Sequence, residues 1–298
     1  MLIGIIDVGS HTIRLSVFKV ETDGTFIPVT DKKVAIGLAG YEEDGTLNPA
    51  GEAKLCKCLL EFKHITSALE VAQVYVFATE SLRRVSNAEQ VITQIYAQTG
   101  LSLELLSGEA EARLSFLGAQ YSTSIEDGLV IDIGGASCEL IQAVNGSIEE
   151  LYSIPIGCLS LSLQSGSDIL PDHQEIQSMK AVIDRQLATV AGLFKEPAPT
   201  LCFVGGTARA AYRIAREFKP RDARYLEPDE LEAVIAGLNR WDAEVIKAVR
   251  LAAPERVFTI SAGLLIMQAV IQASHPTTLL VSKCGIREGY LIDNVIKG

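Results

Sequence analysis

Residues 3–20 read IGIIDVGSHTIRLSVFKV, and residues 128–144 read GLVIDIGGASCELIQAV. The two stretches align when Asp7 is placed on Asp132. Each consists of an apolar run, an Asp-x-Gly turn and a second apolar run, a pattern typical of a β-hairpin. Because the pattern recurs at about the length of one domain, it predicts two related halves that each open with a hairpin.

The two Asp-x-Gly turns combine groups that suit phosphate and metal. A carboxylate at the end of a buried strand can hold hydrated Mg²⁺, and glycines let backbone N–H groups approach an anion closely. Two such turns facing each other across a cleft would bind neighbouring phosphates. Asp7 and Asp132 are therefore predicted metal ligands. The predicted phosphate-binding residues of the turns are Gly9, Ser10, His11, Gly134, Gly135, Ala136 and Ser137.

A third glycine turn ends the stretch TLCFVGG (200–206) and opens a helix. A helix N-terminus attracts anions through its exposed N–H groups and its dipole, so Gly205 and Gly206 are also predicted to bind phosphate. The alternative is a turn that is glycine-rich only for close packing. Arginines recur along the same helix and form either a basic stripe for a longer anion or a solvated face; they are Arg209, Arg213 and Arg216.

The remaining segments alternate helical and strand-like patterns, which predicts an α/β fold. In the first half we expect helices at 50–69 and 87–98, strands at 73–79 and 101–106, and a helix capped by Ser107. In the second half we expect a strand near 148–154, helices at about 173–194, 228–240 and 254–273, a strand at 278–282 and a terminal helix. The predicted domains are 1–122 and 123–298, and the terminal helix at about 286–298 is a candidate for packing on the first domain.

Composition restricts the class of protein. The chain has 298 residues, is 48% hydrophobic and carries a formal net charge of −11, with no Lys/Arg-rich run, so nucleic acid is not an expected partner. No apolar run approaches the ~20 residues of a membrane helix, and the start lacks the features of a signal peptide. Six scattered cysteines without a CxxC pair predict reduced thiols, so we expect a cytoplasmic protein without a membrane partner.

Four segments together resemble the exopolyphosphatase / guanosine pentaphosphate phosphohydrolase family, within the superfamily of sugar kinases, actin and heat-shock ATPases. They are DVGSHTIRL (7–15), ATESLRRVSN (78–87), SGEAEARLSFLG (107–118) and DIGGASCEL (132–140). The resemblance implies two related actin-like (ribonuclease H-like) domains with an interdomain phosphate-binding cleft. It also implies a short form without the C-terminal helical module of longer relatives.

The resemblance further implies roles for particular residues. Glu111 matches the glutamate taken as general base, Arg14 and Arg83 match basic residues near the phosphates, and Glu139 matches a metal ligand beside Asp132. Where this chain has His11, Ala136 and Cys138, the family usually has Asn, Gly and Thr. A β-carbon at residue 136 would crowd a phosphate if that position needs a positive φ.

The predicted function is hydrolysis of a terminal phosphoanhydride, with release of orthophosphate and with Mg²⁺ or another divalent cation as cofactor. The expected substrate is inorganic polyphosphate, with short chains favoured, or guanosine pentaphosphate, and a homodimer is possible. Short chains are favoured because an acidic chain repels a long polyanion and the three arginines named above form its only candidate basic track. The alternatives are a non-catalytic or weakly catalytic phosphonucleotide sensor and an ATP-dependent kinase on the same scaffold.

Overall fold

The computed structural model describes residues 1–166, 170–220 and 225–297. The chain divides into two compact units, one formed by Met1–Glu111 with Tyr290–Gly298 and the other by Ala112–Gly289. The division between the units falls inside α4 (Gly108–Thr123), earlier than the boundary at 122/123 that the sequence suggested. Apolar residues of α4 before residue 122 already pack in the second unit.

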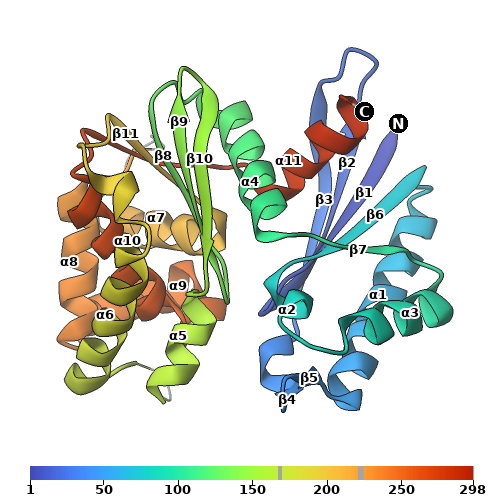
Figure 1. The fold of residues 1–298 in the computed structure, drawn as a ribbon, viewed down its shortest axis with the longest axis horizontal. Coiled ribbons are helices and arrows are strands. Elements are labelled where there is room, and N and C mark those ends of the chain that lie inside the picture. Colours follow the sequence, from blue (N-terminus) through green and yellow to red (C-terminus); the bar gives the residue numbers. More distant parts are fainter. Residues whose placement is uncertain (167–169, 221–224, 298) are drawn as a thin grey trace. The chain divides into compact units, whose positions relative to one another are not determined.

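The first unit is built on a five-stranded sheet with the order β3-β2-β1-β6-β7 (Figure 1). Its strands are β1 (Leu2–Val8), β2 (Thr12–Val20), β3 (Phe26–Ala35), β6 (Gln73–Ala78) and β7 (Leu103–Leu105). A small hairpin, β4 (Glu42–Glu43) and β5 (Thr46–Leu47), precedes α1 (Pro49–Ala68), and the short α2 (Glu80–Arg83) precedes α3 (Ala88–Thr99). One face of the sheet packs against α1 and α3, through side chains such as Phe62 and Ile95.

The opposite face of the first sheet receives the end of the chain. Tyr290 stacks on Phe77 with ring centroids 4.9 Å apart, and its hydroxyl donates to Glu104 at 2.7 Å. Helix α11 (Ile286–Leu291) therefore begins in the second unit and enters the first at Tyr290, and a single π-helical segment at Ile292–Ile296 follows it.

The second unit is built on a five-stranded sheet with the order β10-β9-β8-β11-β12. Its strands are β8 (Gly128–Ile133), β9 (Cys138–Val144), β10 (Ser147–Ile154), β11 (Thr200–Val204) and β12 (Thr278–Val281). Its helices after α4 are α5 (Cys158–Ser165), α6 (His173–Ala188), α7 (Gly205–Phe218), α8 (Pro228–Asn239), α9 (Ala243–Ala252) and α10 (Ile260–Ser274). Short 3₁₀ turns occur at Ala191–Phe194 and Pro254–Arg256.

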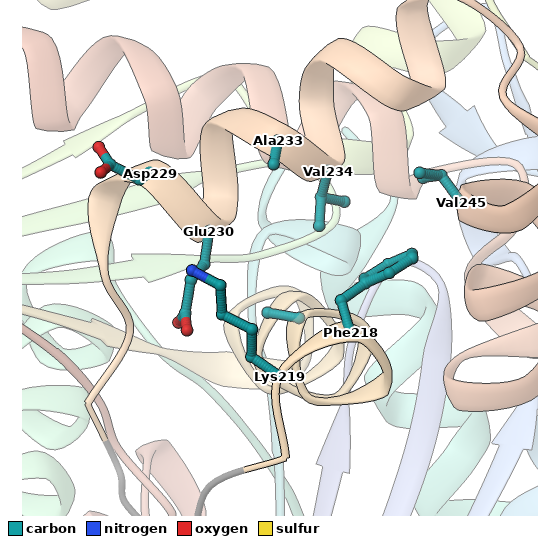
Figure 2. Close-up of a pocket in the computed structure, with 8 residues that line it drawn as sticks. Phe218, Lys219, Asp229, Glu230, Ala233, Val234 and Val245 are labelled. Atoms are coloured by element: carbon teal, nitrogen blue, oxygen red, sulfur yellow. The ribbon is translucent and has the colours of Figure 1, made fainter.

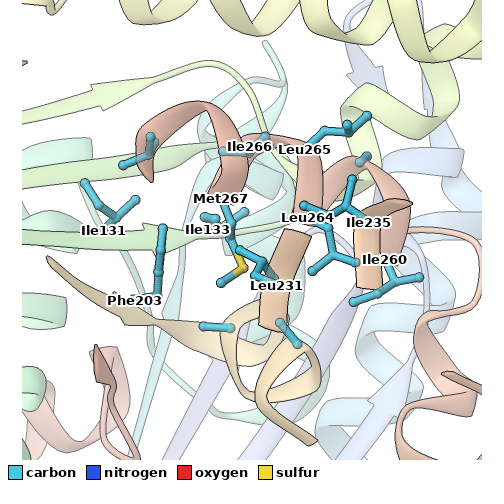
Figure 3. Close-up of a cluster of buried hydrophobic side chains, with 14 of the residues drawn as sticks. Ile131, Ile133, Phe203, Leu231, Ile235, Ile260, Leu264, Leu265, Ile266 and Met267 are labelled. Atoms are coloured by element: carbon cyan, nitrogen blue, oxygen red, sulfur yellow. The ribbon is translucent and has the colours of Figure 1, made fainter. Parts of the chain in front are cut away.

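Alternating strand residues of the second sheet face two different cores. Ile131 and Phe203 pack with α10 residues such as Leu264 and Met267 (Figure 3). Val130 and its neighbours pack instead against Ala112, Phe116 and Ala119 of α4. The sheet is thus buried on both faces, as its nearly continuous apolar strands require.

The two sheets have the same topology, which confirms the predicted α/β fold with two related halves. In each, the first three strands are antiparallel and the fourth and fifth run parallel to the first. The register repeats as well, because Asp7 pairs with Arg14 where Asp132 pairs with Glu139.

The sequence-based prediction missed α5, α9, β3 and the β4–β5 hairpin. The α5 segment CLSLSLQS alternates Leu and Ser, which is the period of a strand rather than of a helix. It nevertheless forms a helix because its first N–H groups find acceptors in the preceding hairpin turn. In the part of the chain that the structure describes, no helix is both long and apolar enough to cross a membrane.

Candidate active site

The two hairpin turns are closed by the same hydrogen bond. In the first unit the amide of Gly9 donates to the carbonyl of Thr12 at 3.1 Å. In the second unit the amide of Gly134 donates to the carbonyl of Ser137 at 3.0 Å. The repeat seen in the sequence is therefore also a repeat of backbone geometry.

A following segment orients the peptide groups of each turn. The carbonyl of Ser10 accepts from the amide of Ala39 at 3.3 Å, and the carbonyl of Gly135 accepts from the first residues of α5 at 2.8 and 2.9 Å. In a trans peptide the C=O and the next N–H point in opposite directions. The amides of His11 and Ala136 therefore point away from these segments, which is the orientation that a phosphate-binding turn needs.

The departures from the family pattern do not strain the second turn. Positive φ angles in non-glycine residues occur at other positions, so Ala136 has an ordinary backbone conformation. Ala136 is also buried, with 4% of its surface exposed. Cys138 is buried in the core, and burial raises the pKa of its thiol well above the ordinary value, so it stays protonated.

Glu111 lies in a defined position near the start of α4. The hydroxyl of Ser107 accepts from the amide of Ala110 at 3.1 Å, which confirms Ser107 as the cap, and its carbonyl accepts from the amide of Glu111 at 2.9 Å. Glu111 is only 8% exposed, whereas Glu109 in the same turn is exposed. The carboxylate of Glu111 is thus held in place while that of Glu109 faces solvent.

Arg83 is the cation next to Glu111. Its Nη1 donates to Oε2 of Glu111 at 3.1 Å and to the carbonyl of Leu106 at 2.9 Å, and its Nε donates to Oε2 of Glu80 at 2.9 Å. Burial by itself would lower the pKa of Arg83, but the charges of Glu111 and Glu80 raise it, so the guanidinium is charged. The predicted phosphate contact of Arg83 competes with these protein contacts.

Arg14 makes a strong contact outside the turn. Its Nε donates to both carboxylate oxygens of Asp31 on β3, at 2.6 and 2.9 Å. Arg14 also stands opposite Asp7 in the β1–β2 register. The structure therefore places Arg14 beside the first turn but ion-paired across the sheet with Asp31.

Asp132 and Glu139 bring two carboxylates to one face of the second sheet, because directly paired residues of antiparallel strands share a face. Ser115 donates to Oδ2 of Asp132 at 2.6 Å, and Ser153 donates to Oε1 of Glu139 at 2.9 Å. Burial of its carboxylate raises the pKa of Asp132, against the lowering effects of the Ser115 hydrogen bond and of nearby Arg209 and Arg287.

The glycine turn at the start of α7 packs directly on this carboxylate. Gly205 has a φ of 88°, and a β-carbon there would stand 2.4 Å from Oδ1 of Asp132. A β-carbon on Gly206 would stand 2.0 Å from Nη2 of Arg256, whose Nη1 donates to the hydroxyl of Thr207 at 3.3 Å. The N-terminus of α7 therefore contacts two side chains of opposite charge, Asp132 at Gly205 and Arg256 at Gly206.

The sequence reasoning did not single out Arg256. It stands in the segment PERVFTISAG, and nothing in that segment's pattern distinguishes its single arginine from a solvated one. Arg256 ends the 3₁₀ turn before α10, and α10 packs closely on α7, because a β-carbon on Gly263 would stand 2.3 Å from Thr207.

The three arginines of α7 do not form an open basic track. Arg216 donates to buried Glu230 at 2.6 Å, and Arg213 donates to the carbonyl of Ala252 at 2.8 Å. Arg209 approaches the carbonyl of Lys283 at 3.4 Å. The interpretation of a stripe that grips a longer anion is therefore not supported by the side-chain contacts.

A hollow of about 220 Å³ lies at the far end of α7 from its glycine turn (Figure 2). Phe218, Val234 and Val245 form much of its wall, and Lys219 and Glu230 lie at its side. Since Glu230 already binds Arg216, and since the hollow contains none of the turn residues, it is separate from the candidate site.

The donor groups fit a magnesium ion that keeps most of its water. Among the residues described by the structure, no three His, Cys, Asp or Glu side chains are grouped to enclose a metal. Asp132 and Glu139 offer two carboxylates on one face of the sheet, and Mg²⁺ typically takes one or two carboxylates together with waters and substrate phosphates.

Comparisons with known proteins match nearly the whole chain. The model of the Ppx/GppA phosphatase family matches residues 17–297. Exopolyphosphatase 1 from Mycobacterium tuberculosis is 28% identical over 309 residues, which cover 98% of this chain and 88% of that protein. Exopolyphosphatase 1 from Mycobacterium leprae is 27% identical, with coverage of 98% and 89%.

Solved structures also match over essentially the whole chain. The Aquifex aeolicus member of the Ppx/GppA family superposes with a TM-score of 0.82 at 26% identity, covering 100% of this chain and 98% of that one. An exopolyphosphatase from Cytophaga hutchinsonii superposes with a TM-score of 0.88 at 20% identity and the same coverage, which shows a common fold.

Proposed function

The chain belongs to the Ppx/GppA phosphatase family, and from that premise we propose that it is an exopolyphosphatase. The proposed reaction is hydrolysis of the terminal phosphoanhydride of inorganic polyphosphate. Water attacks the terminal phosphorus, the bond to the bridging oxygen breaks, and orthophosphate leaves together with a chain shortened by one unit.

The observation that carries the proposal is the fixed carboxylate of Glu111. It is nearly buried, its Oε2 is held by Arg83 at 3.1 Å, and it belongs to a helix whose start is capped. Phosphoryl transfer needs little covalent chemistry from a protein, but it needs a group that orients the attacking water. In our proposal Glu111 accepts a hydrogen bond from that water.

The turn amides supply the second requirement, which is neutralisation of phosphate charge. The outward-pointing amides of His11 and Ala136 would donate to phosphate oxygens, and the start of α7 with Arg256 would add a further positive region. The turn amides are oriented in advance, because other segments already hold the turn carbonyls.

We propose Mg²⁺ as the cofactor, with Asp132 and Glu139 as its ligands in the second unit and Asp7 as a candidate in the first. When bound, the ion would neutralise charge that develops on the transferred phosphoryl group. Ser115 and Ser153 orient the two carboxylates of the second unit, which keeps their remaining oxygens in a fixed direction.

Short chains are the proposed preferred form of the substrate, with guanosine pentaphosphate as the second candidate substrate. The net charge of −11 disfavours a long polyanion, and the arginines of α7 are engaged with protein groups rather than available as a track. The sensor alternative loses part of its motivation because Ala136 does not distort the second turn.

The proposed location is the cytoplasm. All six cysteines are free thiols, and five of them are buried, which suits a reducing compartment.

The decisive experiment measures phosphate release from tripolyphosphate, long polyphosphate, guanosine pentaphosphate and ATP, each with Mg²⁺ and with excess chelator. Glu111→Gln should lower turnover by about two to four orders of magnitude, the range for loss of an acid–base group. Glu109→Gln is the matched control, because it removes an exposed carboxylate from the same turn of α4. Equal losses in both variants would contradict the role of Glu111, and absence of release from all substrates would contradict the proposed function.

A further inference from the structure

Glu80 forms an ion pair with Arg83 on the side of the guanidinium away from Glu111. Oε2 of Glu80 accepts from Nε of Arg83 at 2.9 Å and lies 2.5 Å from Nη2. Both side chains are largely covered, with 16% and 23% of their areas exposed. The contact is therefore a two-point, charge-assisted one in a partly dehydrated place, which is the strong class of hydrogen bond.

The donors of Arg83 are almost all used by protein groups. An arginine side chain has five N–H bonds in a rigid fork. Nε and one Nη2 bond face Glu80, and the Nη1 bonds face Leu106 and Glu111. This leaves a single Nη2 bond for any other acceptor. Arg83 in this arrangement is better placed to hold Glu111 than to bind phosphate.

The segment that carries Glu80 and Arg83 is fixed to the sheet. The hydroxyl of Ser81 donates to the carbonyl of Val8 at 2.8 Å, and Leu82 is fully buried. Glu80 and Arg83 are three residues apart in α2 and so lie on one side of its single turn. We therefore expect the backbone to stay in place when the side chain of residue 80 is changed.

We propose that Glu80 is a positioning residue for Glu111, acting through Arg83. By occupying the Nε edge of the guanidinium, Glu80 directs Nη1 toward Leu106 and Glu111. Oε2 of Glu111 is then held, and the carboxylate keeps one orientation toward the attacking water. This inference rests on the proposed function, since it concerns the orientation of the proposed catalytic group.

The test compares Glu80→Gln, Glu80→Asp and a control in one assay of phosphate release from tripolyphosphate. Without the carboxylate, Arg83 can rotate about its remaining contacts and Glu111 loses its orientation. In Glu80→Gln we expect kcat to fall by about 10- to 100-fold, the range for a misplaced group, with KM unchanged or lower. The reason for the KM effect is that the freed Nε edge becomes available to phosphate. Glu80→Asp keeps the charge and should recover part of kcat.

The control is Glu42→Gln. This variant breaks the exposed ion pair between Glu42 and Arg84, in which Nη2 of Arg84 lies 3.3 Å from the carboxylate. Arg84 is the residue next to Arg83, so the control changes a neighbouring arginine contact. We expect wild-type kcat and KM from this variant. Thermal melting of all variants verifies folding, and Glu80→Asp provides the kinetic answer if Glu80→Gln does not fold.

Failure of this inference can be told apart from failure of the proposed function. If wild type is active, Glu111→Gln is inactive and Glu80→Gln equals wild type, the positioning role is overturned and the proposed function stands. Crystal structures of wild type and Glu80→Gln give a readout that needs no activity. Displacement of the Arg83 guanidinium from Leu106 and Glu111 in the variant would support the inference, and an unmoved guanidinium would overturn it.

Discussion

Replacing Gly205 with alanine should disturb the candidate site through a single β-carbon. Gly205 has a φ of 88°, a conformation that L-residues rarely adopt, and the added carbon would stand 2.4 Å from Oδ1 of Asp132. No atom can remain at that distance, so the carboxylate must move. Movement of Asp132 breaks or lengthens the 2.6 Å hydrogen bond that it receives from Ser115.

The expected magnitude has two parts. The backbone strain amounts to about 1–2 kcal/mol, and loss of a hydrogen bond to a charged group adds about 1.5–3 kcal/mol. A sum of roughly 2.5–5 kcal/mol corresponds to a fall in Tm of about 5–20 °C for a unit of this size. Displacement of a catalytic-site carboxylate by about 1 Å should reduce kcat by about 100-fold.

The matched control is Gly166→Ala in the same unit. Gly166 has a φ of 75°, and a β-carbon there would meet no atom within 4 Å. This variant should show only the strain, with a smaller fall in Tm and wild-type kcat. The assay is thermal melting together with phosphate release at saturating tripolyphosphate. Equal Tm losses in the two variants, with wild-type kcat in Gly205→Ala, would refute the reasoning that Gly205 is required by its approach to Asp132.

Three further predictions follow from contacts in the second unit. Burial raises the pKa of Asp132, so the folded state holds its proton more tightly than the unfolded state, and this stabilising contribution is lost as pH rises through the raised pKa. The test compares the Tm of Asp132→Asn with that of wild type in the presence of chelator. The difference, variant minus wild type, should increase from pH 4 to pH 7, because only wild type loses stability as Asp132 ionises. A difference that stays constant would argue against a raised pKa of Asp132. Ser115→Ala should lower kcat by about 10-fold through a less well oriented Asp132 and raise the Mg²⁺ concentration needed for half activity, and an unchanged Mg²⁺ response would contradict this. Arg256→Lys keeps the charge but loses the planar fork over Gly206, so KM for tripolyphosphate should rise by about 10-fold; wild-type KM would place Arg256 outside the phosphate site.

Sequence patterns were sufficient to predict the two related α/β halves, because the fold repeats a local signal. The aligned runs around Asp7 and Asp132 predicted two hairpins, and the structure repeats their register and even the closing hydrogen bond of each turn. The placement of Ser107 as a helix cap was also readable, since capping is decided by neighbouring residues.

The parts that the sequence did not reveal depend on contacts between distant segments. Arg256 reaches Gly206 only through the packing of two helices, and Ser115 reaches Asp132 only because α4 lies on the second sheet. The sequence suggested that the α7 arginines could bind a long anion, but Arg216 donates a hydrogen bond to Glu230 on the next helix. The two residues of each of these pairs are not separated by a number of residues that a helix or strand repeat would predict, so no periodicity in the sequence indicates the contact.

The conformation of each hairpin turn is restrained by a segment well downstream of it. Ala39 in the first unit and the start of α5 in the second hold the turn carbonyls, in addition to the hydrogen bond that closes each turn. Variation at residues 11 and 136 is therefore decoupled from backbone shape, which is why a histidine and an alanine occupy these positions without positive φ angles. Substitutions at residues 11 and 136 should therefore change the side chains beside each turn while Ala39 and α5 keep holding its carbonyl.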